Sequence, residues 1–359
     1  MKLEELAGRC GVWLRGSGPE SDIVVSSRIR LARNLADYPF IRRCSDHDLT
    51  SIENHVRSAL RDIQELSSSF YVDVHGLSPL DRQLLVERQL ISREHASGRG
   101  ARGAAIDQDE QYSVMINEED HLRLQVMGSG LDLDETWRAV DRLDDALSER
   151  LAYAFSDKRG YLTACPTNVG TGLRVSVMLH LPALVITREI EKVFRGLQKI
   201  SLAVRGLYGE GSQAMGDFYQ ISNQITLGYT EHDLIERVRE VVNTLIAFER
   251  KARDYLLNES QDNLNDKVAR AFEHLCQAKD ISSEETMALL SSVRMGVNLG
   301  LIRNLEMPTI NKLFIHTQPA HLQKLRGNSL DKPGDRNVER AHYLQEQLKS
   351  VLGPDASKS

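Results

Sequence analysis

Two alternating stretches on either side of three consecutive acids constrain the fold most strongly. The segment SVMINEEDHLRLQVM, residues 113–127, alternates apolar and polar side chains on both flanks of Glu118, Glu119 and Asp120. A period of two is typical of half-buried strands, so both flanks are predicted to be strands. The acidic triplet has two explanations. It forms an exposed polar turn, because turns favour such residues, or it forms a carboxylate site on a rigid scaffold.

The same period assigns side chains to the two faces of the predicted strand. If the segment is extended throughout, its polar face carries Asn117, Glu119, His121, Arg123 and Gln125. The other face then carries Ile116, Leu122, Leu124 and Val126. This parity places Glu119 and Arg123 on one shared polar surface, unless the three acids bulge the strand.

Composition excludes several classes of protein. The 359 residues are 41% hydrophobic, enough for a core, and the formal charge of -6 argues against a general nucleic-acid binder. The most apolar run, VSVMLHLPALVI, is interrupted by His180 and Pro182, so no membrane span or targeting segment is expected. Four widely spaced cysteines favour neither a zinc ribbon nor a disulfide framework and fit a reducing cytoplasm.

Strand-like and helix-like segments are interleaved along the first two thirds of the chain. Strands are expected from about Ser21, at YSVMI and over the β-rich run GYLTACPTNVGTGLRVSVMLHL, with hairpin-like connections dominating. Amphipathic helices are expected over residues 50–66, 80–90, 134–155 and 190–204, and a mobile loop over residues 98–111. The pattern predicts an α+β fold with an antiparallel sheet flanked by helices.

The last third has helical spacing and few strand-like runs. Thr230 and Asp233 form a plausible capping box for a long helix, and the polar stretch NESQDNLND follows that helix. A second capping box is expected at Ser282 and Glu285. We therefore expect a catalytic domain over residues 21–255 and a helical C-terminal domain over residues 262–352.

Arginines gather at strand ends and glycine turns. SSRIR places Arg28 and Arg30 on one strand face, Arg123 and Arg174 follow alternating segments, and Arg205 precedes a glycine-rich turn that holds Glu210. Five permanent cations suit a triphosphate, because guanidinium groups match phosphate oxygens. The common phosphate-loop and protein-kinase motifs are missing from the sequence. Taken singly, an arginine is more often a solvated surface residue, and Arg33, Arg42 and Arg43 keep that interpretation.

The ordered motifs SSRIR, NEEDHLR, CPTNVGTGLR and RGLYGEG resemble those of the phosphagen (guanidino) kinases. With GYLTACP and ISNQITLG, the chain is most similar to the bacterial protein-arginine kinase branch of that family. The resemblance covers about residues 21–251 and, more weakly, the helical tail. It implies an ATP- and Mg²⁺-dependent kinase of protein arginine side chains. A small-molecule guanidino kinase and a phosphoarginine-binding pseudokinase adaptor are the alternatives.

Site residues carry over from the resemblance position by position. It implies that Glu119 and Glu210 grip the acceptor guanidinium, that Cys165 has a supporting electrostatic role, and that Glu118 and Asp120 organise the loop or bind magnesium through water. The implied nucleotide contacts are Ser26, Ser27, Arg28, Ile29, Arg30, Gln89, Arg123, Arg174, Val175, Ser176, Val177, Met178, Arg205, Gly206, Leu207, Tyr208 and Gly209. Gln89 stands where a histidine is expected in this branch. No metal is expected to bind without nucleotide, because His121 and His180 lack a second ligand at metal-site spacing.

Two further expectations concern partners. Animal members of the family carry an additional domain of about one hundred residues, an ordinary small-domain size, before the SSRIR motif. The short lead here favours an open site and protein substrates with exposed arginines. The resemblance also implies marking for a Clp-type protease and a zinc-binding activator, and the helical tail offers a surface for a homodimer.

The tail sequence RNVERA, residues 336–341, resembles a phosphoarginine-binding motif, R-D-x-x-R-A. Arg336, Asn337 and Arg340 are the implied contacts, with Asn337 in place of the motif's aspartate. Two arginines one helical turn apart can still clasp a phosphate. The alternative is a solvated, charged helix face.

Overall fold

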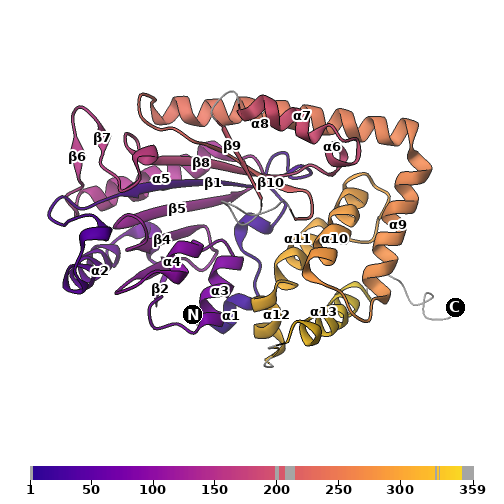
Figure 1. The fold of residues 1–359 in the computed structure, drawn as a ribbon, viewed down its shortest axis with the longest axis horizontal. Helices are drawn as coiled ribbons and strands as arrows, with labels where there is room; N and C mark the ends of the chain where they lie inside the picture. Colours follow the sequence, from indigo (N-terminus) through magenta and orange to yellow (C-terminus); the bar gives the residue numbers. More distant parts are fainter. Residues whose placement is uncertain (1–2, 199–201, 207–214, 328–329, 331, 350–359) are drawn as a thin grey trace.

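The fold is built on one large antiparallel sheet. The computed structural model describes residues 3–198, 202–206, 215–327, 330 and 332–349. Within these residues eight strands run in the order β2-β3-β4-β5-β1-β8-β10-β9, and every ladder is antiparallel (Figure 1). The strands are β1 (Val24–Arg33), β2 (Phe70–Asp73), β3 (Gly103–Ile106), β4 (Tyr112–Ile116), β5 (Leu122–Ser129), β8 (Leu173–His180), β9 (Leu202–Arg205) and β10 (Phe218–Asn223). A separate hairpin pairs β6 (Phe155–Ser156) with β7 (Gly160–Tyr161).

Helices flank this sheet and form the whole last third of the described chain. The first group is α1 (Leu3–Ala7), α2 (Asp46–Leu60), α3 (Pro79–Glu87), α4 (Arg93–Ser97), α5 (Leu133–Ser148), α6 (Pro182–Ile186), α7 (Ile190–Gln198) and α8 (Glu231–Glu259). The second group is α9 (Gln261–Gln277), α10 (Ser283–Asn298), α11 (Met307–His316), α12 (Pro319–Arg326) and α13 (Pro333–Leu348). The predicted α+β class, with an antiparallel sheet flanked by helices, is confirmed.

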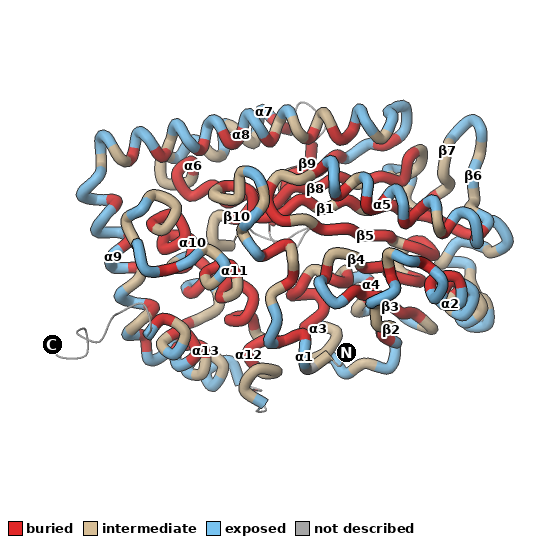
Figure 2. Tube along the Cα trace, turned by 180° about the vertical axis from the view of Figure 1, so that it is seen from behind, coloured by how far each residue is buried: buried red, intermediate tan, exposed pale blue. Residues whose placement is uncertain are grey.

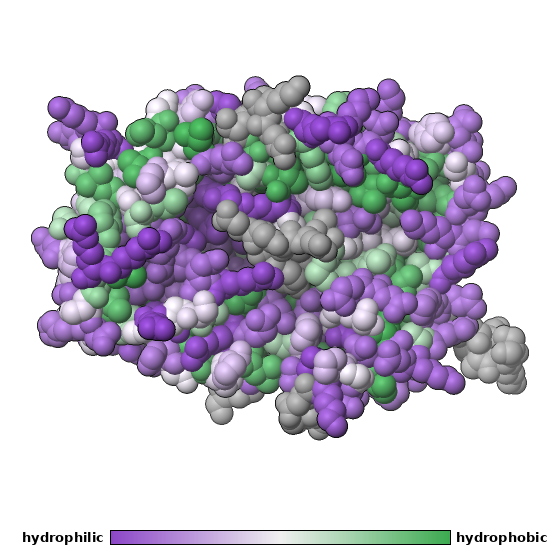
Figure 3. Space-filling view, viewed as in Figure 1, coloured by the Kyte–Doolittle hydropathy of each residue, from purple (hydrophilic) through white to green (hydrophobic). Residues whose placement is uncertain are grey.

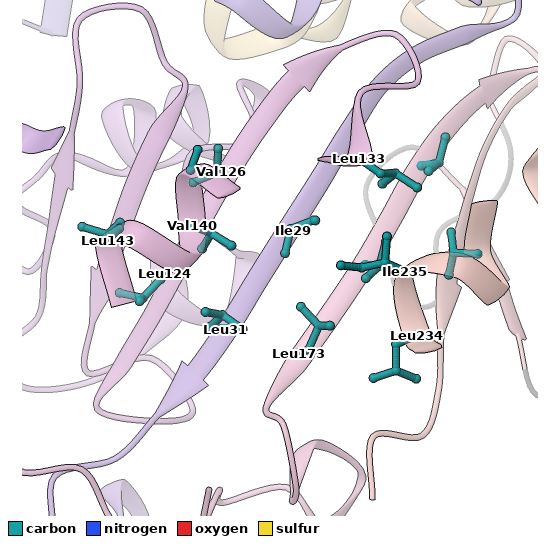
Figure 4. Close-up of a cluster of buried hydrophobic side chains, with 14 of the residues drawn as sticks. Ile29, Leu31, Leu124, Val126, Leu133, Val140, Leu143, Leu173, Leu234 and Ile235 are labelled. Carbon is teal, nitrogen blue, oxygen red and sulfur yellow. The ribbon is translucent and has the colours of Figure 1, made fainter. Parts of the chain in front are cut away.

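Alternation along the central strands builds the main core. Figure 4 shows Ile29 and Leu31 of β1 beside Leu124, Val126 and Leu173 of the neighbouring strands, all pointing to one face. α5 and α8 close this face with Val140, Leu143, Leu234 and Ile235. The predicted parity is correct from Leu122 onward, because burying one face of the sheet requires every second residue to be apolar.

The opposite face of the sheet is divided into an apolar and a polar part. At one end Met127, Met178 and Phe218 pack against the C-terminal helices, where the Phe218 and Phe314 rings lie 4.5 Å apart. Glu87 of α3 strengthens this junction by accepting the backbone N–H groups of Ala320 and His321 at the start of α12. Figure 2 shows the sheet strands buried between these layers. The remaining part of this face is polar.

Three expected elements differ from the structure. The expected loop over residues 98–111 contains β3, whose four residues are all buried, and a Cβ on Gly103 would lie 1.9 Å from the Tyr71 hydroxyl. The expected helix over residues 134–155 ends at Ser148. The expected helix over residues 190–204 ends at Gln198, because its last residues belong to β9, which pairs with β10.

Both expected helix starts in the last third are present. Thr230 and Asp233 form a complete capping box for the 29-residue α8, whereas at α10 the Ser282 side chain accepts from the Glu285 backbone N–H.

Among the described residues no helix is both long and apolar enough to cross a bilayer.

Candidate active site

The polar part of the sheet face forms the floor of a cavity of about 820 Å³. Figure 3 shows it as a hydrophilic hollow on the face viewed in Figure 1. Eight of the residues expected at the site line it: Arg28, Arg30, Gln89, Glu119, Arg123, Cys165, Arg174 and Arg205. They come from β1, β5, β8, β9 and three connecting segments. The fold thus brings together residues that are up to 177 positions apart, from Arg28 to Arg205.

Strand register places the arginines next to one another. Arg30 lies directly opposite Arg174 in the β1–β8 ladder, and Ala32 lies opposite Arg123 in the β1–β5 ladder. Like charges directly opposite each other destabilise a sheet. Burial, together with neighbouring Arg174, Arg123 and Arg205, lowers the pKa of Arg28 to about 10. A polyanion in the cavity would relieve this repulsion.

Neutral amides hold Arg28 in place. Its two terminal nitrogens donate to Gln89 Oε1 at 2.9 Å and to Gln220 Oε1 at 2.6 Å. Gln89 has a positive φ of 62°, and its backbone oxygen accepts from Gln125 Nε2 at 2.7 Å. Sequence reasoning did not select Gln220, although alternation along β10 puts it on the same face as Ser222, which accepts from Arg174.

The three acids form a turn that is also a carboxylate site. Asn117, with a φ of 60°, and His121 close the turn through a backbone hydrogen bond, so the strand pattern does not continue through it. Glu118 is buried, and its Oε1 accepts from Arg123 at 2.8 Å and from Ser92 Oγ at 2.6 Å. Burial opposes ionisation of Glu118, but Arg123 and Ser92 outweigh it and hold its pKa below the usual value.

Glu118 and Glu119 both line the cavity, but Glu119 differs from its two neighbours because much of its side chain is exposed. Its side chain is 40% exposed, and Oε2 lies 3.4 Å from Arg123 NH2. Burial raises the pKa of Glu119; Arg123 opposes the shift, whereas Asp120 and Glu118 add to it. A carboxylate with a raised pKa is a better proton acceptor than an ordinary surface glutamate.

Asp120 connects the acidic turn to the segment that carries Cys165. It is fully buried, and its Oδ1 accepts from Asn34 Nδ2 and from the Ala164 backbone N–H, both at 2.6 Å. Glu119 precedes Asp120 and Cys165 follows Ala164, so this hydrogen bond fixes the spacing of the two cavity residues. The Cys165 thiol lies 3.0 Å from Thr167 Oγ1. Asp120 thus joins three segments: the one that holds Asn34, the acidic turn, and the one that holds Ala164 and Cys165. We name this connection the Asp120 bridge.

Several implied nucleotide contacts do not reach the cavity with their side chains. Ile29, Val175 and Val177 belong to the core on the opposite face of the sheet, as the period of two requires. Met178 packs beneath the C-terminal helices, and Ser27 donates to the Gly130 oxygen and accepts from the Asp132 N–H. The side chains of these five residues therefore do not line the cavity. Ser26, Ser176 and Gly206 are also buried and do not line the cavity. Leu207, Tyr208, Gly209 and Glu210 lie outside the described residues.

One of the three arginines expected on the surface has another position. Arg33 is buried, pairs with Asp144 at 2.6 Å and lies over the Tyr161 ring at 3.5 Å from its centroid. Arg42 is exposed but lines the cavity, where it acts on the charge of Glu119. Arg42 and Arg43 are both exposed, as expected, so only Arg33 departs from the surface interpretation.

The tail motif lies on α13 with its arginines in different environments. Arg340 is buried and donates to Thr317 O, Ile281 O and Asn337 Oδ1, whereas Arg336 donates to Leu330 O. A fully solvated helix face is therefore the wrong description of this motif, because Arg340 joins α13 to two other segments.

The fold and the cavity define a guanidino-phosphotransferase catalytic domain followed by a helical domain. A family model described as "ATP:guanido phosphotransferase, C-terminal catalytic domain" matches residues 51–252, and one described as "Protein-arginine kinase McsB C-terminal domain" matches residues 261–359. Among solved structures, lombricine kinase superimposes with a TM-score of 0.58 and 27% identity over 66% of this chain and 69% of its own. The duplicated taurocyamine kinase of Schistosoma mansoni, with bound transition-state-analog components, gives a TM-score of 0.61 and 28% identity over 66% of this chain and 34% of its own.

Relatives that match almost the whole chain narrow this class. The protein-arginine kinase of Symbiobacterium thermophilum is 47% identical over 97% of this chain and 99% of its own, and that of Bacillus subtilis is 43% identical over 94% and 93%. The chain belongs to the protein-arginine kinases of the ATP:guanido phosphotransferase family.

Proposed function

We propose that this enzyme transfers the γ-phosphate of ATP to guanidinium groups of arginine side chains in proteins. The observation that carries the proposal is one cavity in which Glu119 and Cys165 lie beside five arginines. The arginines suit the phosphates and the carboxylate suits the acceptor, so a single site holds both substrates.

The arginine cradle is Arg28, Arg30, Arg123, Arg174 and Arg205, with Gln89 as an amide contact. Its cations would bind the phosphates and stabilise charge on the γ-phosphoryl group as it transfers. Gln89 already orders Arg28, so its amide replaces the stacking surface of a histidine with a hydrogen bond. At Ser26, Ser176 and Gly206, at the edge of the cradle, we propose that only backbone atoms contact the nucleotide.

Glu119 acts as the general base in this proposal. An arginine guanidinium has a pKa above 12, so forming its neutral nucleophile at pH 7 costs roughly 7 to 9 kcal/mol at about 1.36 kcal/mol per unit. Glu119 accepts the proton as the nitrogen attacks phosphorus. The N–P bond forms while the bond to the β-phosphate oxygen breaks, and ADP leaves. Glu210 would orient the nitrogen, and the Cys165 thiol would contact the guanidinium.

Mg²⁺ would enter with the nucleotide. The described residues contain no cluster of three or more carboxylate, histidine or cysteine side chains arranged around a metal. Glu118 Oε1 accepts from Arg123 and Ser92 and its Oε2 accepts from the Glu119 N–H, so this carboxylate is not arranged to chelate a metal. This donor set fits a magnesium ion that keeps its waters and binds mainly to phosphate oxygens. The ion supplies charge neutralisation on the phosphates when bound.

The remaining assignments rest on the family and on the helical domain. We propose a catalytic domain over residues 21–255 and a helical domain over 262–352, with α8 ending at Glu259 and α9 beginning at Gln261. Arg336, Asn337 and Arg340 are proposed to bind phosphoarginine. A zinc-binding activator, delivery of substrates to a Clp-type protease, a homodimer and a cytoplasmic location complete the proposal.

Phosphoarginine mass spectrometry tests the function directly. The enzyme is incubated with ATP, Mg²⁺ and an unfolded arginine-rich protein, and in parallel with free arginine and with taurocyamine. Phosphate on protein arginines is the expected result. Transfer only to the small guanidines would favour a small-molecule kinase, and binding of phosphoarginine without any transfer would favour an adaptor.

A further inference from the structure

An exposed apolar surface adjoins the acceptor end of the cavity. Phe155, Ile225 and Leu227 are 56%, 46% and 53% exposed, so each leaves about half of a large apolar side chain in water. Figure 3 shows hydrophobic side chains beside the hydrophilic hollow, on its left. Scattered exposed apolar residues are common, but a contiguous group of them marks an interaction site.

Contacts between neighbouring segments make this group contiguous. The Phe155 and Tyr161 rings lie 5.3 Å apart edge to face, and Tyr161 pairs through its backbone with Gly170. A Cβ on Gly170 would lie 3.1 Å from Leu227 Cα, and Thr226 Oγ1 donates to the Thr167 and Val169 oxygens. We name the surface of Phe155, Tyr161, Ile225 and Leu227 the apolar rim.

The rim continues directly into the catalytic cavity. Ile225 belongs to the rim and also lines the cavity, together with Gln224, Thr167, Asn168 and Cys165. The segment QITLGY, residues 224–229, has no charged residue. The rim therefore begins on the wall where the acceptor guanidinium is proposed to bind.

The supports of the rim are rigid. Tyr161 stacks against the Arg33 guanidinium, which pairs with buried Asp144, and Thr226 ties the 224–229 segment to the 167–169 segment by two hydrogen bonds. A surface held in this way loses little conformational entropy when a ligand covers it. Figure 2 shows the β6–β7 hairpin that carries Phe155 at the outer edge of the molecule, where a long chain can approach it.

The acceptor arginine determines what can reach the rim. When its side chain enters the cavity, its backbone remains at the mouth, and an extended chain advances about 3.3 to 3.6 Å per residue. Residues two to four positions from the acceptor therefore lie roughly 7 to 14 Å along the surface. Since the rim starts at the cavity wall, these flanking residues are the groups placed over it.

We propose that the apolar rim binds an apolar side chain two to four residues from the acceptor arginine in an extended polypeptide substrate. This inference rests on the proposed function and names the sequence context that the site selects. Apolar flanks are usually buried in folded proteins, so the rim favours arginines in unfolded segments. The charged residues Arg42, Arg93 and Glu94 also line the cavity and are not part of the apolar rim.

Paired acceptor peptides test the rim. Each peptide carries one arginine in a glycine-serine sequence, with leucine or serine at positions two to four on either side. Binding is measured by fluorescence anisotropy without ATP, and transfer is measured as kcat/KM. We expect leucine on at least one side to improve both by about tenfold, or about 1.4 kcal/mol.

Variants locate the effect on the rim. Leu227→Ser and Phe155→Ser are expected to reduce the leucine preference to less than threefold and to leave the serine peptide within twofold of wild type. Tyr255→Ser removes a similarly exposed ring, 57% exposed on α8, and is expected to keep the full preference. Equal loss in Tyr255→Ser, or no leucine preference in the wild type, would overturn the proposal.

Two outcomes separate this inference from its alternatives. Tight binding of the leucine peptide without any phosphate transfer would contradict the proposed function and support the rim. A change of oligomeric state in Leu227→Ser, measured by light scattering at the assay concentration, would assign the surface to a contact between copies of the chain and overturn the proposal.

Discussion

The cavity face of the sheet and the junction between sheet and C-terminal helices use arginine in opposite ways. In the cavity, Arg28 donates to two neutral amides and Arg30 lies opposite another arginine. At the junction and nearby, Arg88 pairs with Glu110 and Arg253 pairs with Glu249, all of them buried. Arginines whose charge is balanced inside the protein stabilise the fold. Arginines crowded together leave positive charge for a ligand.

This difference also explains the two roles of carboxylates around the cavity. Glu118 is buried against Arg123 and has a lowered pKa, whereas Glu119, one residue later, is 40% exposed and has a raised pKa. Position in the turn decides which acid neutralises an arginine and which is available to a substrate. The comparison therefore predicts separate effects on activity and on stability.

The largest effect is expected from the acid that faces the cavity. Glu119→Gln should lower kcat for arginine phosphorylation by about 10² to 10⁴, the range for loss of a general base, while the KM for ATP stays within a few-fold. Glu210→Gln should behave similarly. Steady-state assays of ADP release, checked by phosphoarginine mass spectrometry, measure both. Full activity in either variant would remove that glutamate from the mechanism.

The pH profile sharpens the same prediction. A raised pKa means that Glu119 takes up its proton at a higher pH than an unperturbed glutamate, near 4.3. Because only the carboxylate form accepts a proton, kcat/KM should fall on the acid side through a pKa above about 4.3. For stability the sign is opposite, since folding favours the protonated form and this contribution is lost as pH rises through the folded pKa. An acid limb at or below that value would contradict the role.

A smaller but still large effect separates the two kinds of arginine. Arg88→Met should lower the free energy of unfolding by about 3 to 5 kcal/mol, because Glu110 would be left buried without its partner. Arg28→Met should leave it unchanged or raise it, because a crowded cation is removed. Urea unfolding of the two variants measures both values. Equal destabilisation would break the comparison.

The elements that sequence predicts best are those whose burial has a clear period. β5 was predictable because Leu122, Leu124 and Val126 alternate with polar residues. β3 was missed because its four residues are glycine, alanine and isoleucine between polar turns, with little strand preference. The spacing of α7 continues into β9, so the pattern alone could not show where the helix ends.

Sequence order also recovered part of the site. The motif order identified Glu119, Cys165 and the five arginines, all of which line the cavity. It also identified Glu210, which lies outside the described residues. It did not reveal the Asp120 bridge, because Asn34, Asp120 and Ala164 meet only through the folded sheet. Arg42 gave no signal either, since an exposed arginine at the mouth of a cavity resembles any other surface arginine.

Ligand stabilisation tests the same comparison with an effect of about 2.7 kcal/mol. Tripolyphosphate at about one hundred times its dissociation constant should stabilise the fold by that amount, which corresponds to a melting-temperature increase of roughly 3 to 4 °C for a chain of 359 residues. Thermal unfolding without Mg²⁺ measures it. Arg88→Met should start from a lower melting temperature and keep the increase, whereas Arg28→Met should lose most of it. The opposite pattern would place the anion at the junction.

The smallest predicted effect concerns the tail motif, where one arginine is held by the fold and is also proposed to bind a ligand. Arg340 is buried and engaged by backbone oxygens, and burial lowers its pKa to about 10, yet the resemblance assigns it to phosphoarginine. Asn337 accepts from Arg340 NH1 at 2.9 Å but offers no carboxylate to the guanidinium of a ligand. A missing charge-assisted contact costs about 1 to 3 kcal/mol. Asn337→Asp should therefore tighten binding of phosphoarginine by about tenfold, or about 1.4 kcal/mol.

Calorimetric titration of free phosphoarginine into the full-length enzyme measures this change. Gln347→Glu is the matched control, because it adds the same charge to α13 ten residues, or about 15 Å, further along the helix. Equal tightening in both variants would mean that only the overall charge matters. Absence of binding to the wild type and to Asn337→Asp would make Arg340 a structural arginine like Arg88. Selective tightening in Asn337→Asp would show that an arginine held by the fold can also serve a ligand when one carboxylate is added beside it.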